Sequence, residues 1–419
     1  MRNFGNYIFL ALLLLVTFFL CWYVFQALKT IVGTWQNPIL RTGVAISYWL
    51  VFSVYCVLVV STFLTIFQEK NISSRSQMIL NVFLTVSITQ LTVILFLFGE
   101  DLFRLARGGV NFFSASSPED GSLIPGRRLF VSHLALMVAA IPLYSFVYGM
   151  LKGKYNFKVF REVLYFDDLP DAFDGFTITQ ISDIHAGSFK DPDAVQKGID
   201  LAIAQGSDLF VFTGDLVNHT ADEIEPLLDR FRGIKAPYGQ YSILGNHDYG
   251  DYISWSNPLD KASNFESLKK QHQKMGYKLL LDEHVTLEKD GEKLHLLGVE
   301  NWGVGFKSKG NIDKALKGVQ DKDFKILLSH DPSHWDKIIK NHPNKIHLTL
   351  SGHTHGMQMG VETPLFRWSP AQYRYPQWAG LTEQAGRFLY VNRGFGFHAF
   401  AGRVGIWPEV TVIKLKKSA

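Results

Sequence analysis

Cysteine is scarce in this 419-residue chain, which excludes a disulfide framework. The only two cysteines, Cys21 and Cys56, lie inside long apolar segments, where we expect them to be packing residues. Dense blocks of lysine and arginine are also missing, and aromatic residues do not alternate with basic ones. Although the net charge is +4, this pattern argues against nucleic acid as a partner.

Charged side chains are absent from four long apolar segments near the start of the chain, at about 7–28, 44–67, 78–98 and 129–150. Each is long enough to cross a bilayer, which takes about 20 helical residues. The first outlasts the apolar core of a signal peptide, and no small-x-small cleavage site follows it, so we interpret it as a retained anchor. His133 is the only ionisable residue inside these segments, so they show no sign of an ion or proton path. We predict a transmembrane region over 1–152 and a catalytic domain over 153–419.

The even number of predicted spans puts the start of the chain and the catalytic domain on the same side of the membrane. A basic cluster directly follows the last span: Lys152, Lys154, Lys158 and Arg161. Because positive charge favours the cytoplasmic side, we expect a cytoplasmic catalytic domain on a bacterial inner or plasma membrane. The stretch after Gly99 either lies on the membrane surface or extends the third helix, and we favour the extension.

Polar residues of metal-binding type follow short apolar runs in the second part of the chain. These residues are Asp183, His185, Asp215, Asn246, His330, His353 and His355. The runs before them are FTITQIS, LFVFT, YSIL, FKILLS and IHLTLS, whose length and β-branched content are typical of buried strands. Open α/β sheets bind ligands at the carboxyl ends of their strands, so the sequence predicts one dinuclear metal site there.

The donor types also fit this chemistry. Carboxylate and amide oxygens together with imidazole nitrogens, without thiolate, suit two divalent ions such as Mn, Fe, Zn or Mg. Two such ions about 3.5–4 Å apart can hold an attacking hydroxide and polarise phosphoryl oxygens. Each motif alone has a structural explanation, because Gly-Asp is a common turn and Asn-His-Asp can cap a helix. Their joint occurrence at strand ends favours the metal site.

Strand-like and helical patterns alternate from about Tyr155 onward. We expect helices over 192–205, 221–233, 264–275 and 332–341, and further strands in LHLLGVE, RFLYVN and VTVIKL. This order predicts an α/β fold in which two stacked sheets are flanked by helices.

The ordered blocks D-x-H, G-D, G-N-H-D, H and G-H-x-H resemble those of the calcineurin-like metallophosphoesterase superfamily. The resemblance runs from about Phe176 to the C-terminus. It extends to the bacterial branch that joins this domain to membrane segments, because the ending NRGFGFHAFAGRVGIWPEVTVIKL is similar to the closing block of that branch. The resemblance implies a four-layer αββα sandwich that hydrolyses phosphomonoesters, phosphodiesters or pyrophosphates.

The resemblance also implies roles for the individual residues. One metal ion would be held by Asp183, His185 and His355. The other would be held by Asn246, His330 and His353. Asp215 would bridge the two ions, and His247 would be the general acid that protonates the leaving oxygen.

Two positions depart from the family pattern. Many relatives carry an aspartate that orients the catalytic histidine where this chain has Asn218. The change could lower the pKa of His247 or transfer the orienting role to Asp248. Relatives often have glycine where this chain has Met357, and this side chain would narrow the rim of the site.

The aromatic stretch over 366–378, FRWSPAQYRYPQW, has two interpretations. It is either a loop packed over the sheet or a rim that meets the bilayer or an acyl chain. In the second case Arg374 or Arg393 would bind the substrate phosphate. His219 and His398 follow no recognisable ligand spacing.

We therefore expect a membrane-anchored phosphohydrolase that cleaves a phosphodiester or pyrophosphate, and we favour a lipid or lipid-linked substrate. Two alternatives are a phosphoprotein phosphatase and a metal-bound scaffold without catalysis. The scaffold is disfavoured because the full set of ligands and the general acid are present in the sequence.

Overall fold

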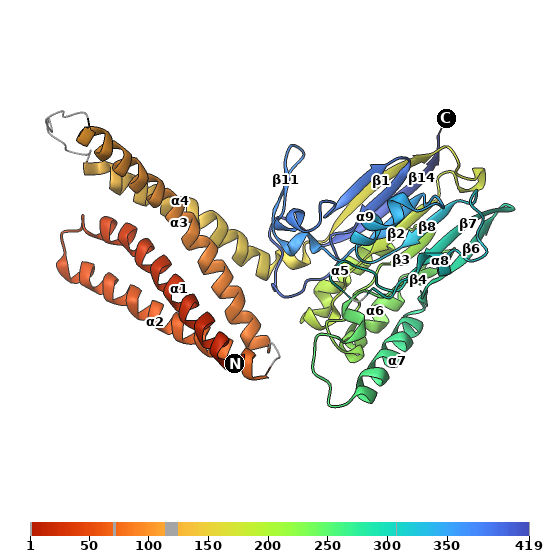
Figure 1. Cartoon of the computed structure of the whole chain (residues 1–419), viewed down its shortest axis with the longest axis horizontal. Helices are drawn as coiled ribbons and strands as arrows, with labels where there is room; N and C mark the ends of the chain where they lie inside the picture. The colour runs from red at the N-terminus through yellow and green to blue at the C-terminus, as the bar shows by residue number, and fades with distance from the viewer. Residues whose placement is uncertain (1, 70–72, 114–124, 307, 419) are drawn as a thin grey trace. The chain divides into compact units, whose positions relative to one another are not determined.

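The computed structural model describes residues 2–69, 73–113, 125–306 and 308–418. They divide into two compact units, Met1–Tyr148 and Gly149–Ala419. The first unit is helical and the second contains all the described strands, as the ribbon in Figure 1 shows.

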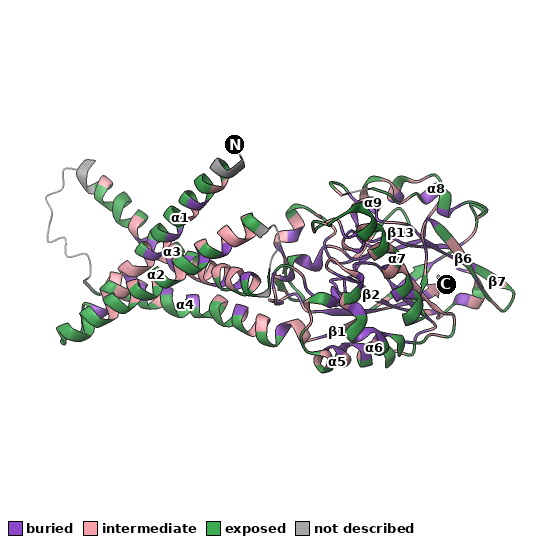
Figure 2. Ribbon diagram, turned by 90° about the horizontal axis from the view of Figure 1, so that it is seen from below, coloured by how far each residue is buried: buried purple, intermediate pink, exposed green. Residues whose placement is uncertain are grey.

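The first unit consists of four long helices: α1 Arg2–Val32, α2 Pro38–Glu69, α3 Ser74–Phe113 and α4 Pro125–Leu151. All four are long and apolar enough to cross a membrane. Helix α3 continues well past Gly99, so the predicted extension of the third helix is confirmed. A small buried cluster contains Ala27, Ala135 and Ala139, and such small side chains let apolar helices approach closely. The remaining helix faces are largely exposed (Figure 2), as expected for surfaces that lie against lipid.

The second unit contains two six-stranded mixed sheets and a small hairpin. The first sheet has the order β1 Lys158–Phe166, β14 Glu409–Lys417, β2 Thr177–Ile181, β3 Leu209–Phe212, β4 Gln240–Ser242 and β5 Lys278–Leu279. The second has the order β12 Gly380–Gln384, β13 Arg387–Val391, β9 Leu348–Ser351, β8 Lys325–Leu328, β7 Glu292–Gly298 and β6 Glu283–Lys289. The hairpin is formed by β10 Val361–Glu362 and β11 Arg367–Trp368. Strand β14 thus lies between β1 and β2, parallel to β1 and antiparallel to β2.

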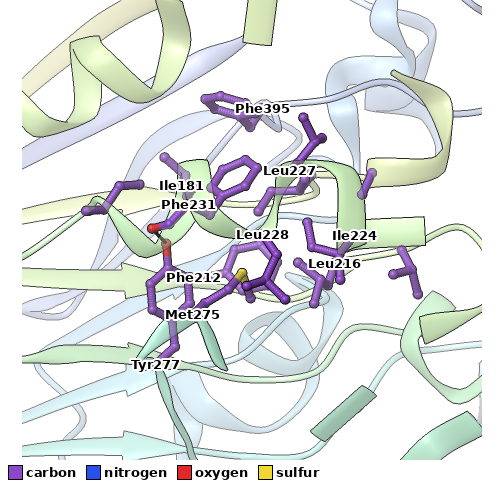
Figure 3. Packing of buried hydrophobic residues seen from close by; sticks show 14 of the residues in the cluster. Ile181, Phe212, Leu216, Ile224, Leu227, Leu228, Phe231, Met275, Tyr277 and Phe395 are labelled. Carbon is purple, nitrogen blue, oxygen red and sulfur yellow. Dashed lines mark hydrogen bonds between the residues drawn. The ribbon is translucent and has the colours of Figure 1, made fainter. Parts of the chain in front are cut away.

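The alternation of side chains along the strands produces the layers. In β3, Leu209 and Val211 face the second sheet, whereas Phe210 and Phe212 pack on the helical side. That outer face of the first sheet is covered by α5 Pro192–Ile203, α6 Leu228–Arg232 and α7 Pro258–Met275. Figure 3 shows Phe212, Leu228, Phe231 and Met275 in this apolar cluster. The outer face of the second sheet packs against α8 Ile312–Ala315 and α9 Ser333–Lys337. The expected four-layer αββα sandwich is confirmed.

Two of the expected helices are not continuous α-helices. Over 221–233 the chain forms a 3₁₀ segment, Ala221–Leu227, before α6 begins. Pro226 lies in this segment, and proline removes a backbone donor and restricts the residue before it, which disfavours a continuous α-helix. Over 332–341 the short helix α9 is followed by a separate 3₁₀ turn, Ile339–Asn341.

Candidate metal centre

The predicted ligands all lie just beyond the carboxyl ends of strands, as the sequence indicated. The first sheet supplies Asp183 and His185 after β2, Asp215 after β3, and Asn246 with His247 after β4. The second sheet supplies His330 after β8, and His353 with His355 after β9. The candidate centre is therefore built from loops of both sheets.

The backbone at these loops is unusual. The left-handed conformation is adopted by five of the candidate ligands: Asp183, His185, Asp215, His353 and His355. Non-glycine residues rarely adopt positive φ, and such conformations concentrate at functional sites. Gly352 lies so close to the carboxylate of Asp183 that a β-carbon would collide with it. The chain therefore turns sharply here, which lets side chains from distant strands converge.

One group of converging side chains contains Asp183, His185 and His355, whose potential ligand atoms all lie within 4.8 Å of one another. His355 Nε2 lies 3.1 Å from both Asp183 Oδ1 and His185 Nε2. All three residues are buried. Two imidazole nitrogens and a carboxylate thus face a common point, as the ligands of a metal ion do.

A second group contains Asp215, His330 and His353, with the same limit of 4.8 Å. His330 Nε2 lies 3.2 Å from Asp215 Oδ2 and 3.3 Å from His353 Nδ1. The same oxygen of Asp215 lies 3.6 Å from His185 Nε2 of the first group. Asp215 therefore lies between the two groups, the place of a carboxylate that bridges two ions.

Asn246 provides the clearest evidence that the site fits a metal ion. Its amide nitrogen donates to the hydroxyl of Tyr252 at 2.8 Å, which fixes the orientation of the amide. Its Oδ1 is buried and has no hydrogen-bond partner among the described residues. Because an unpaired buried oxygen is costly, an oxygen ligand site for a cation explains it well.

Burial and charge set the protonation of the cluster. Burial lowers the pKa of His185, His353 and His355, so these imidazoles stay neutral and keep a lone pair for a metal ion. Burial alone would raise the pKa of Asp215, but His330 and His247 hold it well below its usual range. Burial would lower the pKa of His330, yet Asp215 beside it raises that pKa to about 10. A proton on His330 thus balances the negative charge of Asp215.

Asn218 orients three histidines. Its side-chain oxygen lies 3.0 Å from His185 Nδ1 and 3.1 Å from His398 Nδ1. Its backbone oxygen lies 2.9 Å from His247 Nδ1. Since these oxygens accept hydrogen bonds, each Nδ1 carries a hydrogen, which leaves Nε2 as the nitrogen available to a metal ion or a substrate.

Asp248 does not orient His247, contrary to one of the two possibilities raised by the sequence. Its carboxylate accepts backbone N–H groups of Asp215, Leu216 and Gly245 at 2.8–2.9 Å. Burial and the charge of Asp215 raise the pKa of Asp248 to about 7. Asp248 thus holds the loop after β3 against the loop after β4. The carbonyl of Asn218 supports His247 instead.

Other contacts fix the remaining ligands. Tyr375 places its hydroxyl 2.7 Å from His353 Nε2, which leaves Nδ1 directed at His330. The backbone oxygen of Thr213 lies 2.7 Å from His330 Nδ1. Arg403, which is fully buried, lies 3.1 Å from His355 Nδ1 through its guanidinium. Partners of this kind orient ligands and tune their basicity.

The two predicted phosphate-binding arginines lie in different surroundings. Arg393 is buried, and its guanidinium pairs with Glu409 and Glu362, both at 2.6 Å. These carboxylates already occupy its donors, so the geometry favours a structural role over phosphate binding. Arg374 is exposed and donates to the carbonyl of Val304 at 2.9 Å. Met357 is 46% exposed in the turn after His355, where it borders the site.

The sequence interpretation missed several members of the site. His398 stacks on His185 with ring centroids 4.8 Å apart and lies 4.4 Å from the ring of His247. His219, also unassigned, lies 6.5 Å from His247 by the same measure. Tyr252 and Tyr375 had no recognisable motif. The only available signals were the position of His219 near Asp215 and the aromatic stretch that contains Tyr375.

Both parts of this chain are similar to known protein families. The model for a calcineurin-like phosphoesterase matches residues 176–357, and that for a probable calcineurin-like phosphoesterase transmembrane domain matches residues 2–154. The chain is 30% identical over 269 residues to the UDP-2,3-diacylglucosamine pyrophosphatase LpxG of Chlamydia muridarum, covering 53% of this chain and 78% of LpxG. The chain belongs to the calcineurin-like metallophosphoesterase family.

Two further metallophosphoesterases resemble it. The uncharacterized metallophosphoesterase YkuE of Bacillus subtilis is 29% identical over 256 residues, covering 60% of this chain and 82% of YkuE. The transmembrane protein with metallophosphoesterase domain of Danio rerio is 27% identical over 289 residues, covering 68% of this chain and 62% of that protein. The chain is thus a metal-dependent phosphoesterase and a membrane protein. The family normally uses a pair of divalent ions, in agreement with the His/Asp groups described above.

Proposed function

We propose that this metallophosphoesterase is a membrane-anchored dinuclear-metal hydrolase that cleaves a phosphodiester or a pyrophosphate. The observation that carries the proposal is the position of Asp215 between two groups of buried His and Asp side chains. Asp183, His185 and His355 would hold one ion, and His330, His353 and the unpaired oxygen of Asn246 the other. When bound, the two divalent ions supply an activated water and Lewis acidity toward phosphoryl oxygens.

His247 is the proposed general acid. Its Nδ1 is engaged by the carbonyl of Asn218, so Nε2 is the atom that can carry a proton to the leaving oxygen. The ring lies 4.9 Å from that of His185 and 4.4 Å from that of Tyr252. These neighbours hold the imidazole beside His185, which would be a ligand of the first ion.

The substrate is proposed to be lipid-linked. LpxG, a relative at 30% identity, is named for a pyrophosphate substrate that carries two acyl groups. The four apolar helices would keep the catalytic domain at a bilayer, which raises its effective concentration toward lipid headgroups. We place the protein in a bacterial inner or plasma membrane with a cytoplasmic catalytic domain, because basic residues cluster directly after α4.

The test uses full-length protein in detergent, stripped of metal and then supplied with Mn²⁺. Hydrolysis of bis-p-nitrophenyl phosphate and of diacylglycerol pyrophosphate is measured for the wild type and for Asp215→Asn. We expect Mn²⁺-dependent turnover that falls at least 100-fold in the variant, since the bridging charge is lost. Two bound Mn²⁺ ions without turnover of either substrate would favour the metal-bound scaffold. Folded protein that binds no metal would refute the proposal.

A further inference from the structure

We propose that the β10–β11 hairpin inserts its tip into the boundary between lipid headgroups and acyl chains. There it would receive the acylated substrate for the metal centre. The inference of insertion depends only on the exposed residues and contacts of the hairpin. The delivery of substrate rests on the proposed function.

The tip of the hairpin is apolar and exposed. Leu365 is 99% exposed and Phe366 is 57% exposed, and both lie in the turn between β10 and β11. Tyr373, which follows the hairpin, is 79% exposed, and its hydroxyl lies 3.5 Å from the indole nitrogen of Trp368. Figure 1 shows the hairpin, labelled β11, projecting away from the two sheets. An aliphatic tip flanked by Trp and Tyr is the composition favoured at a membrane interface.

The base of the hairpin is held firmly. Glu362 pairs with Arg367 at 2.9 Å and with Arg393 at 2.6 Å. Arg393 in turn pairs with the fully buried Glu409 at the start of β14. The ion pairs tie the hairpin to the first sheet, so the apolar tip is presented on a fixed support.

The base is also linked to the end of the last candidate span. Gly360, just before β10, donates its N–H to the carbonyl of Val404 at 2.9 Å. Arg403 donates its N–H to the carbonyl of Gly149 at 3.2 Å. Gly149 lies near the end of α4, within the second unit. These two hydrogen bonds link the base of the hairpin to the chain segment that follows the last candidate span, so the partner that we propose for the apolar tip is a bilayer surface.

The segment that follows β11 contacts the candidate metal centre. Ser369 Oγ, directly after β11, donates to the carbonyl of Gly356 at 2.6 Å, next to the candidate ligand His355. Tyr375 then contacts the candidate ligand His353. The segment from Leu365 to Tyr375 therefore connects the exposed apolar tip to candidate ligands of both metal ions. A lipid could keep its acyl chains in the bilayer while its phosphate reaches the site.

The insertion can be measured by spin labelling. In a background with Cys21 and Cys56 replaced by alanine, Leu365→Cys carries a nitroxide in the full-length protein. The protein is placed in nanodiscs of phosphatidylglycerol and phosphatidylcholine. Leu259→Cys is the matched control, because Leu259 is 79% exposed on α7, away from the hairpin in sequence. We expect the label at 365 to be reached by oxygen far better than by water-soluble nickel chelate, and the label at 259 to show the reverse.

A label at 365 that is as open to nickel chelate as the control would overturn the insertion. A label shielded from both reagents would also overturn it, because this result would indicate a covering protein or a second copy of the chain.

The delivery of substrate is tested with Leu365→Asp/Phe366→Asp, with Leu259→Asp as the control. We expect the double variant to hydrolyse diacylglycerol pyrophosphate in vesicles at least tenfold more slowly, and bis-p-nitrophenyl phosphate at the wild-type rate. Equal rates on the vesicles would refute the delivery. A wild type inactive on both substrates would instead count against the proposed hydrolase, while the spin-label result would still decide the insertion.

Discussion

At the residue scale, one neutral amide stands where many relatives carry a carboxylate. The side-chain oxygen of Asn218 accepts hydrogen bonds from His185 and His398, whereas His247 is bound only by the backbone oxygen. An aspartate at this position would add a negative charge beside these imidazoles and favour their protonated forms. The asparagine instead gives His185 and His398 an acceptor without adding charge, and burial lowers the pKa of both imidazoles, so these two stay neutral.

This arrangement predicts that Asn218→Leu weakens metal binding. Without the side-chain acceptor, the ring of His185 can rotate or change tautomer, and loss of such a supporting contact typically costs about 10–100-fold in metal affinity. Titration of the metal-free protein with Mn²⁺ in a calorimeter measures the change. Asn218→Asp keeps an acceptor and should bind Mn²⁺ close to the wild-type affinity. Wild-type affinity in the leucine variant would contradict the positioning role.

Asn246 supports a second prediction at this scale. Because its buried Oδ1 is the proposed amide ligand of one ion, Asn246→Ala should reduce bound Mn²⁺ from two ions to one per chain. Metal content after gel filtration is measured by mass spectrometry, with Asn246→Asp as the control that retains an oxygen ligand. Two tightly bound ions in the alanine variant would exclude Asn246 as a ligand.

The sequence reveals the candidate ligands but not the residues that support them. Candidate ligands such as Asp183 and His330 could be recognised because each follows an apolar strand within a short motif. His398 and Tyr375 could not, because their contacts with His185 and His353 join segments far apart in the chain. The ion pairs of Arg393 were hidden for the same reason, since Glu362 lies in a hairpin that sequence patterns did not indicate, and the assignment of Arg393 to phosphate stays a prediction.

At the scale of elements, Arg393 joins the hairpin to the end of β13 and the start of β14. Arg393→Leu leaves Glu409 buried without its cationic partner, so the free energy of unfolding should fall by about 3–5 kcal/mol. Denaturant unfolding followed by tryptophan fluorescence checks this value. The matched change Arg374→Leu, at an exposed arginine, should leave stability within about 0.5 kcal/mol of the wild type. A raised KM with unchanged stability in the Arg393 variant would restore the phosphate-binding interpretation.

The contact between α7 and β4 makes the fold sensitive to acid. His272 on α7 is fully buried against Ser242 Oγ of β4 at 2.9 Å, and burial lowers its pKa to about 3. The unfolded chain takes up this proton near pH 6.5, whereas the folded chain does so only near pH 3. Stability is therefore complete above about pH 6.5 and falls by about 1.4 kcal/mol per pH unit below it.

We expect His272→Gln to remove this dependence. Between pH 6.5 and 5, the free energy of unfolding should decrease less in the variant than in the wild type. The two slopes should differ by the contribution of one proton, about 1.4 kcal/mol per pH unit. Urea unfolding at several pH values measures both slopes. His342→Gln serves as the control, since His342 is only partly buried and pairs with the exposed Asp313 at 3.2 Å. Identical slopes for His272→Gln and the wild type would show that His272 does not cause the sensitivity.

Secondary structure was most predictable where one physical signal dominated. The buried strands were recognisable because both faces are covered, which gives continuous apolar runs such as β3. The 3₁₀ segment before α6 was mistaken for a helix, although Pro226 is visible in the sequence. The strand order could not be predicted, because pairing of β14 with β1 and β2 depends on contacts across the whole domain.

At the scale of the whole molecule, the number of spans predicts the topology. Four spans place both ends of the chain on one side, and the basic residues after α4 favour the cytoplasm. A C-terminal green fluorescent protein fusion expressed in bacteria should therefore fluoresce, and a C-terminal alkaline phosphatase fusion should be inactive. An active phosphatase fusion with a dark fluorescent fusion would reverse the proposed orientation.

The insertion of β14 between β1 and β2 has a consequence for biosynthesis. Strand β1 leaves the ribosome soon after α4, but its only partner in the sheet is β14. The first sheet therefore cannot be completed until Glu409–Lys417 has been translated. Until then, β1 remains beside the membrane as an unpaired strand. Exposed strand edges invite pairing with other chains. A nascent chain stalled before β14 should thus be a target for chaperones and proteases, and loading of the metal centre should follow translation.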